Sequence, residues 1–105
     1  MEKLTYNEYK NRMKKKELDK PMIIDFYADW CMPCKMYTPV LEEINKERED
    51  IEIVKVNVEE EREFASDMGA LSIPMTLFIN KNKSINRITG AYPKPRVNEF
   101  IKAYF

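Results

Sequence analysis

The chain has 105 residues, of which 44% are hydrophobic and 34% charged, with 18 basic side chains, 18 acidic side chains and no histidine. This length supports one hydrophobic core and excludes a second catalytic domain, so we expect a single domain over residues 1–105. The balanced charge gives no basic field for nucleic acid, and the lack of histidine excludes Cys-His and Ser-His catalysis.

Nothing in the sequence indicates a membrane segment. No run approaches the roughly 18 apolar residues of a membrane-spanning helix, and residues 1–8 lack the apolar core of a secretion signal. We therefore expect a cytoplasmic protein that does not bind membranes, although a chain trimmed of its signal would look the same.

The first predicted element is a surface helix over residues 5–19. Thr5 and Glu8 have the spacing of a capping box, and apolar residues recur at helical intervals among lysines and arginines. The basic run at residues 14–16 is typical of a solvated helix face. A short apolar stretch near Leu4 is compatible with a small edge strand.

Residues 22–27 are predicted to form a buried strand because nearly every position is apolar. Asp25 is the exception. A carboxylate inside such a strand should lie at its end, pair with a cation or carry a raised pKa, and the alternative is that it faces solvent near an edge.

The two cysteines of the chain, Cys31 and Cys34, follow this strand and precede a predicted helix over residues 32–48. At a helix start, unpaired backbone N–H groups and the helix dipole favour thiolate over thiol. Two residues between them place both sulfurs on one turn, close enough for a small disulfide ring. A structural zinc site usually takes four ligands, so this protein could bind zinc only as a dimer that shares two cysteine pairs.

The second half of the chain predicts two more helices and three strands. Alternating and β-branched residues predict a strand over residues 51–58, in which Lys55 faces either solvent or the interior. A helix over 59–68, a hairpin formed by 75–80 and 84–89, and a helix from Pro95 complete the pattern. A βαβ unit followed by a hairpin and a helix predicts an α/β fold: a mixed sheet of four to five strands with helices on both faces.

With this order of elements, the chain resembles the thioredoxin family over nearly its whole length. The residues that carry the resemblance are Asp25 to Lys35, with Trp30-Cys31-Met32-Pro33-Cys34 at their centre, then Pro39, Lys55 to Asn57, Ile73-Pro74 and Gly90-Ala91. Each piece is weak alone, but together, in the strand-to-helix context, they are specific. The resemblance implies the thioredoxin fold and a protein thiol-disulfide oxidoreductase.

The resemblance also implies a role for each cysteine. Cys31 would attack a substrate disulfide and Cys34 would resolve the mixed disulfide. Pro33 would tune the redox properties of the pair. Asp25 would transfer the proton of Cys34 and Lys55 would modulate Asp25, although an Asp–Lys pair can also be only a buried ion pair.

For substrate binding, the resemblance implies a cis peptide bond before Pro74 and an apolar docking groove around Cys31. Its residues would be Trp30, Met32, Ile73, Pro74, Gly90 and Ala91. Packing in the core is the alternative for Trp30. Met32 departs from the glycine of the commonest thioredoxins, which leaves the redox potential open.

The expected partners are disulfide-containing proteins and a thioredoxin-reductase-like electron donor. We expect a monomer with no cofactor beyond its Cys31–Cys34 disulfide and no metal. Three alternatives remain open: an oxidase or isomerase, an extracytoplasmic reductase, and a binding module in which the cysteines are incidental.

Overall fold

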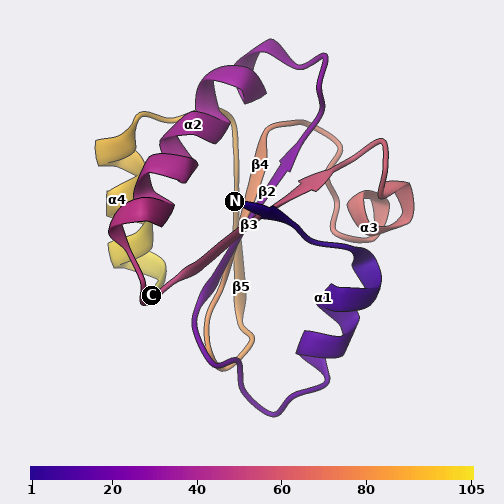
Figure 1. The fold of residues 1–105 in the computed structure, drawn as a ribbon, viewed down its shortest axis with the longest axis vertical. Helices are drawn as coiled ribbons and strands as arrows, with labels where there is room; N and C mark the ends of the chain where they lie inside the picture. The colour runs from indigo at the N-terminus through magenta and orange to yellow at the C-terminus, as the bar shows by residue number, and fades with distance from the viewer.

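The centre of the structure is β2 (Met22–Tyr27), whose apolar residues are buried on both faces of a five-stranded sheet with the order β1-β3-β2-β4-β5. The computed structural model describes residues 1–105 (Figure 1). β1 (Glu2–Lys3) and β3 (Glu52–Asn57) run parallel to β2, and β4 (Met75–Ile79) runs antiparallel to it. β5 (Ile85–Thr89) pairs with β4 as a hairpin. The mixed sheet predicted from the sequence is confirmed.

Four helices cover the two faces of the sheet (Figure 1). On one face, α1 (Tyr6–Met13) and α3 (Arg62–Asp67) pack through Tyr9 and Phe64 against the side chains of Ile24 and Phe26. On the other, α2 (Met32–Glu47) and α4 (Lys94–Tyr104) enclose a second core. None of the helices combines the length and apolar character needed to cross a bilayer.

The predicted helix over residues 5–19 is too long, since α1 ends at Met13. Residues 14–17 are all charged and supply no apolar side chain to hold a further turn against the sheet. The Lys83 ammonium donates to the carbonyls of Met13 and Lys15, which satisfies two carbonyls at the helix end. Lys83 has φ 73° in the β4–β5 turn, a left-handed conformation that usually belongs to glycine.

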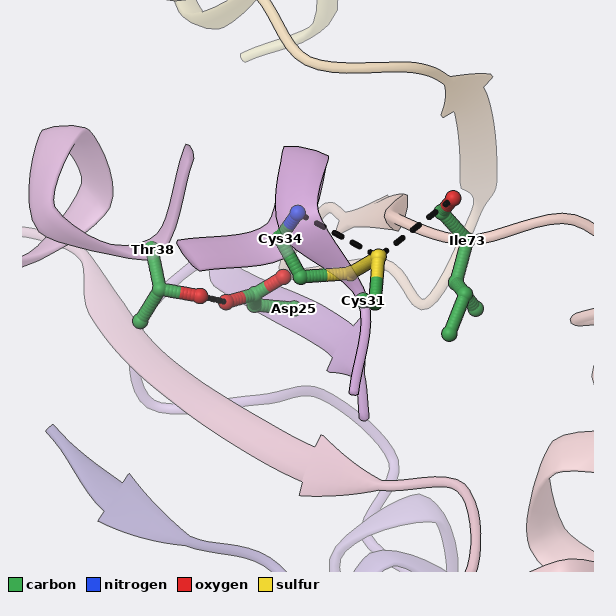
Figure 2. The surroundings of a disulfide bond; sticks show 5 residues. All are labelled: Asp25, Cys31, Cys34, Thr38 and Ile73. Atoms are coloured by element: carbon green, nitrogen blue, oxygen red, sulfur yellow. Dashed lines mark hydrogen bonds between the residues drawn. A yellow bond between two sulfur atoms is a disulfide. The ribbon is translucent and has the colours of Figure 1, made fainter. Parts of the chain in front are cut away.

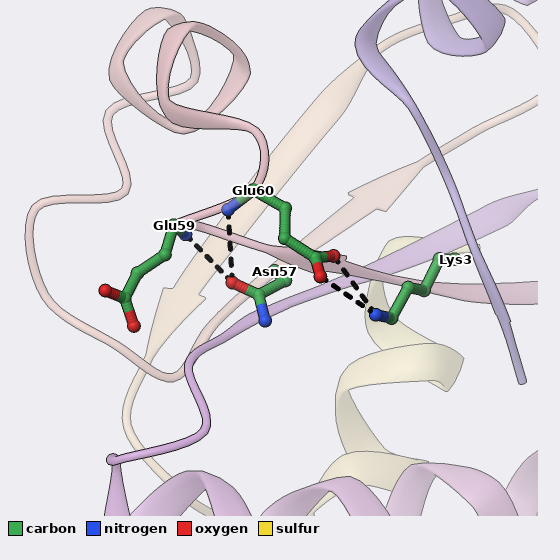
Figure 3. A network of polar contacts seen from close by, with 4 residues as sticks. All are labelled: Lys3, Asn57, Glu59 and Glu60. Carbon is green, nitrogen blue, oxygen red and sulfur yellow. Dashed lines mark hydrogen bonds and ion pairs between the residues drawn. The ribbon is translucent and has the colours of Figure 1, made fainter.

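The end of β3 that lies beside the end of β2 is fixed by Asn57 (Figure 3). This buried side chain accepts hydrogen bonds from the backbone N–H groups of Glu59 (2.9 Å) and Glu60 (3.3 Å). The Glu60 carboxylate in turn accepts from the Lys3 ammonium at 3.0 Å, which ties β1 to the same turn. The turn after β3 is therefore held by a buried amide and an exposed ion pair.

These two contacts should differ in their contribution to stability. We expect Asn57→Ala to lower the free energy of unfolding by about 1–3 kcal/mol, because it leaves two N–H groups without their acceptor. Lys3→Ala removes only an exposed, solvent-screened ion pair and should lower the free energy of unfolding less than Asn57→Ala does. Urea denaturation of both variants measures the difference, and equal losses would contradict this account of the turn.

Candidate active site

Cys31 and Cys34 form a disulfide at the start of α2, with their Cα atoms 5.2 Å apart. Cys31 is the N-cap residue of the helix, and its Sγ accepts the backbone N–H of Cys34 at 3.3 Å (Figure 2). This helix start lies directly after β2, as the sequence predicted. The Cys34 N–H and the positive end of the helix dipole therefore both act on the Cys31 sulfur, where they favour a thiolate.

Both sulfurs are shielded, but the residues around them are not. Cys31 is 5% exposed and Cys34 2%, whereas Trp30 and Met32 are each 66% exposed. The alternative that Trp30 packs in the core is therefore wrong. Pro33, between the cysteines, is also exposed in the first turn of α2.

The opposite side of the disulfide is formed by the segment before β4. The Ile73–Pro74 peptide bond is cis, and the Ile73 carbonyl oxygen lies 3.9 Å from Cys31 Sγ (Figure 2). Neither the N–H nor the carbonyl of Ile73 takes part in a backbone hydrogen bond. Pro74 is buried, and its carbonyl accepts the N–H of Gly90 at 2.9 Å. Gly90 therefore lies beside the cis bond, and the exposed Ala91 follows it.

Asp25 lies on the face of β2 that α2 covers, in the interior of the strand, with 0% exposure. The alternative that it faces solvent near an edge is therefore wrong. Its Oδ2 accepts the Thr38 hydroxyl at 2.7 Å, and its Oδ1 is buried without a hydrogen-bond partner. In Figure 2 the Oδ1 side of the carboxyl points toward the Cys34 side chain.

Burial dominates the electrostatics of Asp25. Desolvation raises the pKa of this carboxyl to about 6, while the Thr38 hydrogen bond and the charge of Lys55 oppose the rise. Lys55 is the direct neighbour of Asp25 in the β2–β3 register, but it makes no hydrogen bond with the carboxyl. Its ammonium lies over the Tyr27 ring, 5.5 Å from the centroid. Asp25 and Lys55 therefore do not form an ion pair, and the Lys55 ammonium acts on the Asp25 carboxyl only through a longer-range electrostatic attraction.

Thr38 is the residue of this site that sequence reasoning missed. It lies four residues after Cys34 in α2, so both side chains share the helix face that covers Asp25. That spacing was the available signal, but threonine is common on half-exposed helix faces and nothing else distinguishes it.

A cavity of about 450 Å³ adjoins the site on the α2 side, with Tyr27, Cys34, Lys35, Thr38 and Pro39 in its wall. A larger cavity of about 850 Å³ lies at the other end of the sheet, near the starts of β2 and β3, and contains neither cysteine. No three Cys, Asp or Glu side chains are grouped to hold a metal ion. Of the two cavities, the smaller one is therefore the one that adjoins the cysteine pair.

The arrangement is one that can exchange two thiols for one disulfide, and comparison with known proteins agrees. The sequence model of the thioredoxin family, described as "Thioredoxin", matches residues 1–103. Thioredoxin of Listeria monocytogenes is 42% identical over 84 residues, which cover 79% of this chain and 82% of that protein.

Solved structures agree with this assignment. Fasciola hepatica thioredoxin superposes with a TM-score of 0.87 at 27% identity, over 100% of both chains. The oxidised form of mitochondrial thioredoxin 3 from Saccharomyces cerevisiae superposes with a TM-score of 0.83 at 30% identity, over 98% of this chain and 94% of that one. The chain therefore belongs to the thioredoxin family and is a thiol-disulfide oxidoreductase.

Proposed function

We propose that this protein reduces disulfides in other proteins and is returned to the dithiol form by a thioredoxin-reductase-like electron donor. The observation that carries the proposal is the position of Cys31. Its sulfur caps a helix N-terminus and lies 3.9 Å from the Ile73 carbonyl oxygen, and its two neighbours in the chain, Trp30 and Met32, have exposed side chains. A nucleophilic thiolate with an apolar rim suits a disulfide presented on a protein surface.

The reaction proceeds by two exchanges. The Cys31 thiolate attacks one sulfur of the substrate disulfide, which forms a mixed disulfide and releases the other substrate sulfur as a thiolate. Cys34 then loses its proton, attacks Cys31 Sγ and releases the second substrate thiolate. The substrate gains two electrons and the Cys31–Cys34 disulfide forms.

Asp25 is the group proposed to take the proton of Cys34. Its unbonded Oδ1 is buried, and with a pKa of about 6 the carboxyl is mostly ionised at neutral pH and can accept a proton. Lys55 modulates this carboxyl through its charge alone, because the two groups are not in hydrogen-bond contact. Pro33 acts on the redox properties of the pair by restricting the first turn of α2.

The proposed substrate groove combines apolar side chains with unpaired backbone. An extended substrate segment can pair with the N–H and carbonyl of Ile73, which make no hydrogen bond to other backbone groups and lie next to the cis bond to Pro74. The apolar rim of Trp30, Met32, Gly90 and Ala91 adds contacts that do not depend on one particular substrate sequence. This combination favours a broad range of protein disulfides. We place this activity, as a single-domain monomer carrying electrons between proteins, in the cytoplasm.

The direction of the reaction is tested by the redox potential of the Cys31–Cys34 pair. We expect a value of about −270 mV, which is typical of thioredoxins, after equilibration with dithiothreitol or glutathione buffers. Cys34→Ser is the control because it forms no intramolecular disulfide. A potential of about −180 mV or higher would instead assign an oxidase or isomerase, with Met32 as the first residue to exchange for glycine.

A further inference from the structure

The hydrogen bond from Thr38 to Asp25 is the one direct polar contact of the buried carboxyl. The distance between the two oxygens is 2.7 Å, and the contact joins α2 to the central strand (Figure 2). A threonine hydroxyl has a single proton, so donating it to Oδ2 fixes the rotation of both groups. With Oδ2 engaged, Oδ1 is the oxygen left to accept another proton.

The other groups that face Asp25 do not provide this constraint. They are Lys55 from β3 and Cys34, Tyr37 and Glu42 from α2, together with the uncharged Thr76 from β4. The Tyr37 hydroxyl is hydrogen-bonded to Thr76 Oγ1 at 2.7 Å. Burial raises the pKa of Tyr37 to about 12, so the Tyr37 side chain stays neutral. Glu42 acts on Asp25 only through its charge.

Thr38 also connects the carboxyl to solvent. It stands in the wall of the cavity of about 450 Å³ that Cys34 also lines, while Asp25 itself is fully buried behind it. Such a space is many times the roughly 30 Å³ that a water molecule occupies. The hydroxyl oxygen keeps lone pairs that can accept a hydrogen bond from this side.

We propose that Thr38 is a positioning residue for proton transfer at Cys34, because its hydroxyl holds Oδ2 of Asp25, directs Oδ1 to the Cys34 thiol and links the carboxyl to the solvent-filled cavity. The inference rests on the proposed role of Asp25 in accepting the Cys34 proton. Thr38 touches neither reacting sulfur in the hydrogen-bond network, so its effect must pass through Asp25. Loss of the Thr38 hydroxyl should therefore shift the pH dependence of the resolving step.

The test follows the resolving step alone in the full chain. Reduced protein is mixed with 5,5′-dithiobis(2-nitrobenzoate). Attack by Cys31 releases one thionitrobenzoate and leaves the other bound to Cys31 as a mixed disulfide. The release of this second thionitrobenzoate by Cys34 is recorded by stopped-flow absorbance as a function of pH. Thr38→Val keeps the shape of the side chain and removes the hydroxyl, whereas Thr38→Ser keeps the hydroxyl. Thr76→Val is the matched control. It also removes a threonine hydroxyl beside Asp25, but this hydroxyl is hydrogen-bonded to Tyr37 and not to the carboxyl.

For Thr38→Val we expect the midpoint of the profile to move up by about one pH unit, since a hydrogen bond that favours the ionised carboxyl is lost. At pH values well below the wild-type midpoint, the resolving step of Thr38→Val should be about tenfold slower than that of wild type, because a one-unit rise in the midpoint lowers the ionised fraction of Asp25 tenfold. Thr38→Ser should restore the midpoint, and Thr76→Val should leave it in place. A Thr38→Val profile that superimposes on wild type, while Asp25→Asn slows the step, overturns the role of Thr38 alone. If Asp25→Asn also leaves the step unchanged, the proposed role of Asp25 is wrong as well.

Discussion

Replacement of Cys31 by serine is expected to abolish the reduction of insulin disulfides by dithiothreitol above the uncatalysed rate. A serine hydroxyl is almost entirely un-ionised at neutral pH, so the nucleophile of the first exchange is lost. The catalysed rate should fall by about three orders of magnitude or more, as it does when an essential nucleophile is removed. The onset and slope of insulin turbidity measure this loss, and the circular dichroism of the variant checks that it is folded.

Cys34→Ser is the matched variant, because it removes the same atom type one turn further along α2. The first exchange remains possible in this variant, but the mixed disulfide on Cys31 cannot be resolved within the molecule. We expect turnover to be lost and a covalent complex with the substrate protein to accumulate, visible on a non-reducing gel and removed by dithiothreitol. If Cys31→Ser accumulated the complex instead, the assignment of the two roles would be reversed. Wild-type protein that does not reduce insulin above the uncatalysed rate would contradict the catalytic role and favour a binding module in which the cysteines are incidental.

Asp25→Asn is expected to stabilise the folded protein at pH 8 and to have little effect on stability near pH 3. The folded-state pKa of Asp25 is raised from 3.8 to about 6, so the folded state binds a proton more tightly than the unfolded chain does. Stability associated with this group is therefore present below pH 3.8 and is lost as the pH rises through about 6. At 1.36 kcal/mol per pKa unit, the loss above pH 6 is about 3 kcal/mol.

Asparagine avoids this loss because it carries no charge at any pH, and its amide oxygen can still accept the Thr38 hydroxyl. Urea denaturation of the oxidised variant and wild type at pH 3 and pH 8 measures the difference. Asp50→Asn is a control of opposite sign: Arg48 lowers the pKa of that exposed carboxyl to about 2, so its contribution is present above the unfolded-state pKa and is lost as the pH falls. An Asp25→Asn variant that is no more stable than wild type at pH 8 would show that Asp25 is not a desolvated carboxylate.

The gain in stability should coincide with a slower resolving step. Without a carboxylate, Cys34 must give its proton to water, and general-base catalysis of this kind is typically worth about 100-fold or more. Increased stability together with reduced activity in the same variant would indicate that burial of the Asp25 carboxylate lowers the stability of the fold but is needed for proton transfer.

Most of the elements were predictable because their signals are local. The apolar run of β2 and the β-branched residues of β3 determine these strands, and the structure ends both within a residue of the predicted bounds. α2 and α4 follow from apolar spacing in the same way. α1 was predicted too long because the charged residues 14–17 add no apolar contact with the sheet, and because the carbonyls at its end bind Lys83, a residue about 70 positions away in the β4–β5 turn. A contact of that kind leaves no trace in the periodicity of the helix itself.

At the site, the redox chemistry follows from local features of the chain. The cysteine spacing and its place between a strand and a helix fix the disulfide and the N-cap environment of Cys31, since both depend on neighbours in the chain. The hydrogen-bond partner of the buried Asp25 carboxyl, in contrast, depends on how the elements pack in three dimensions. Register places Lys55 beside Asp25, but the lysine side chain is long enough to reach the Tyr27 ring, and the short hydroxyl of Thr38 on α2 takes the contact instead. That choice depends on how closely a helix packs on a sheet, which residue spacing along a single chain does not specify.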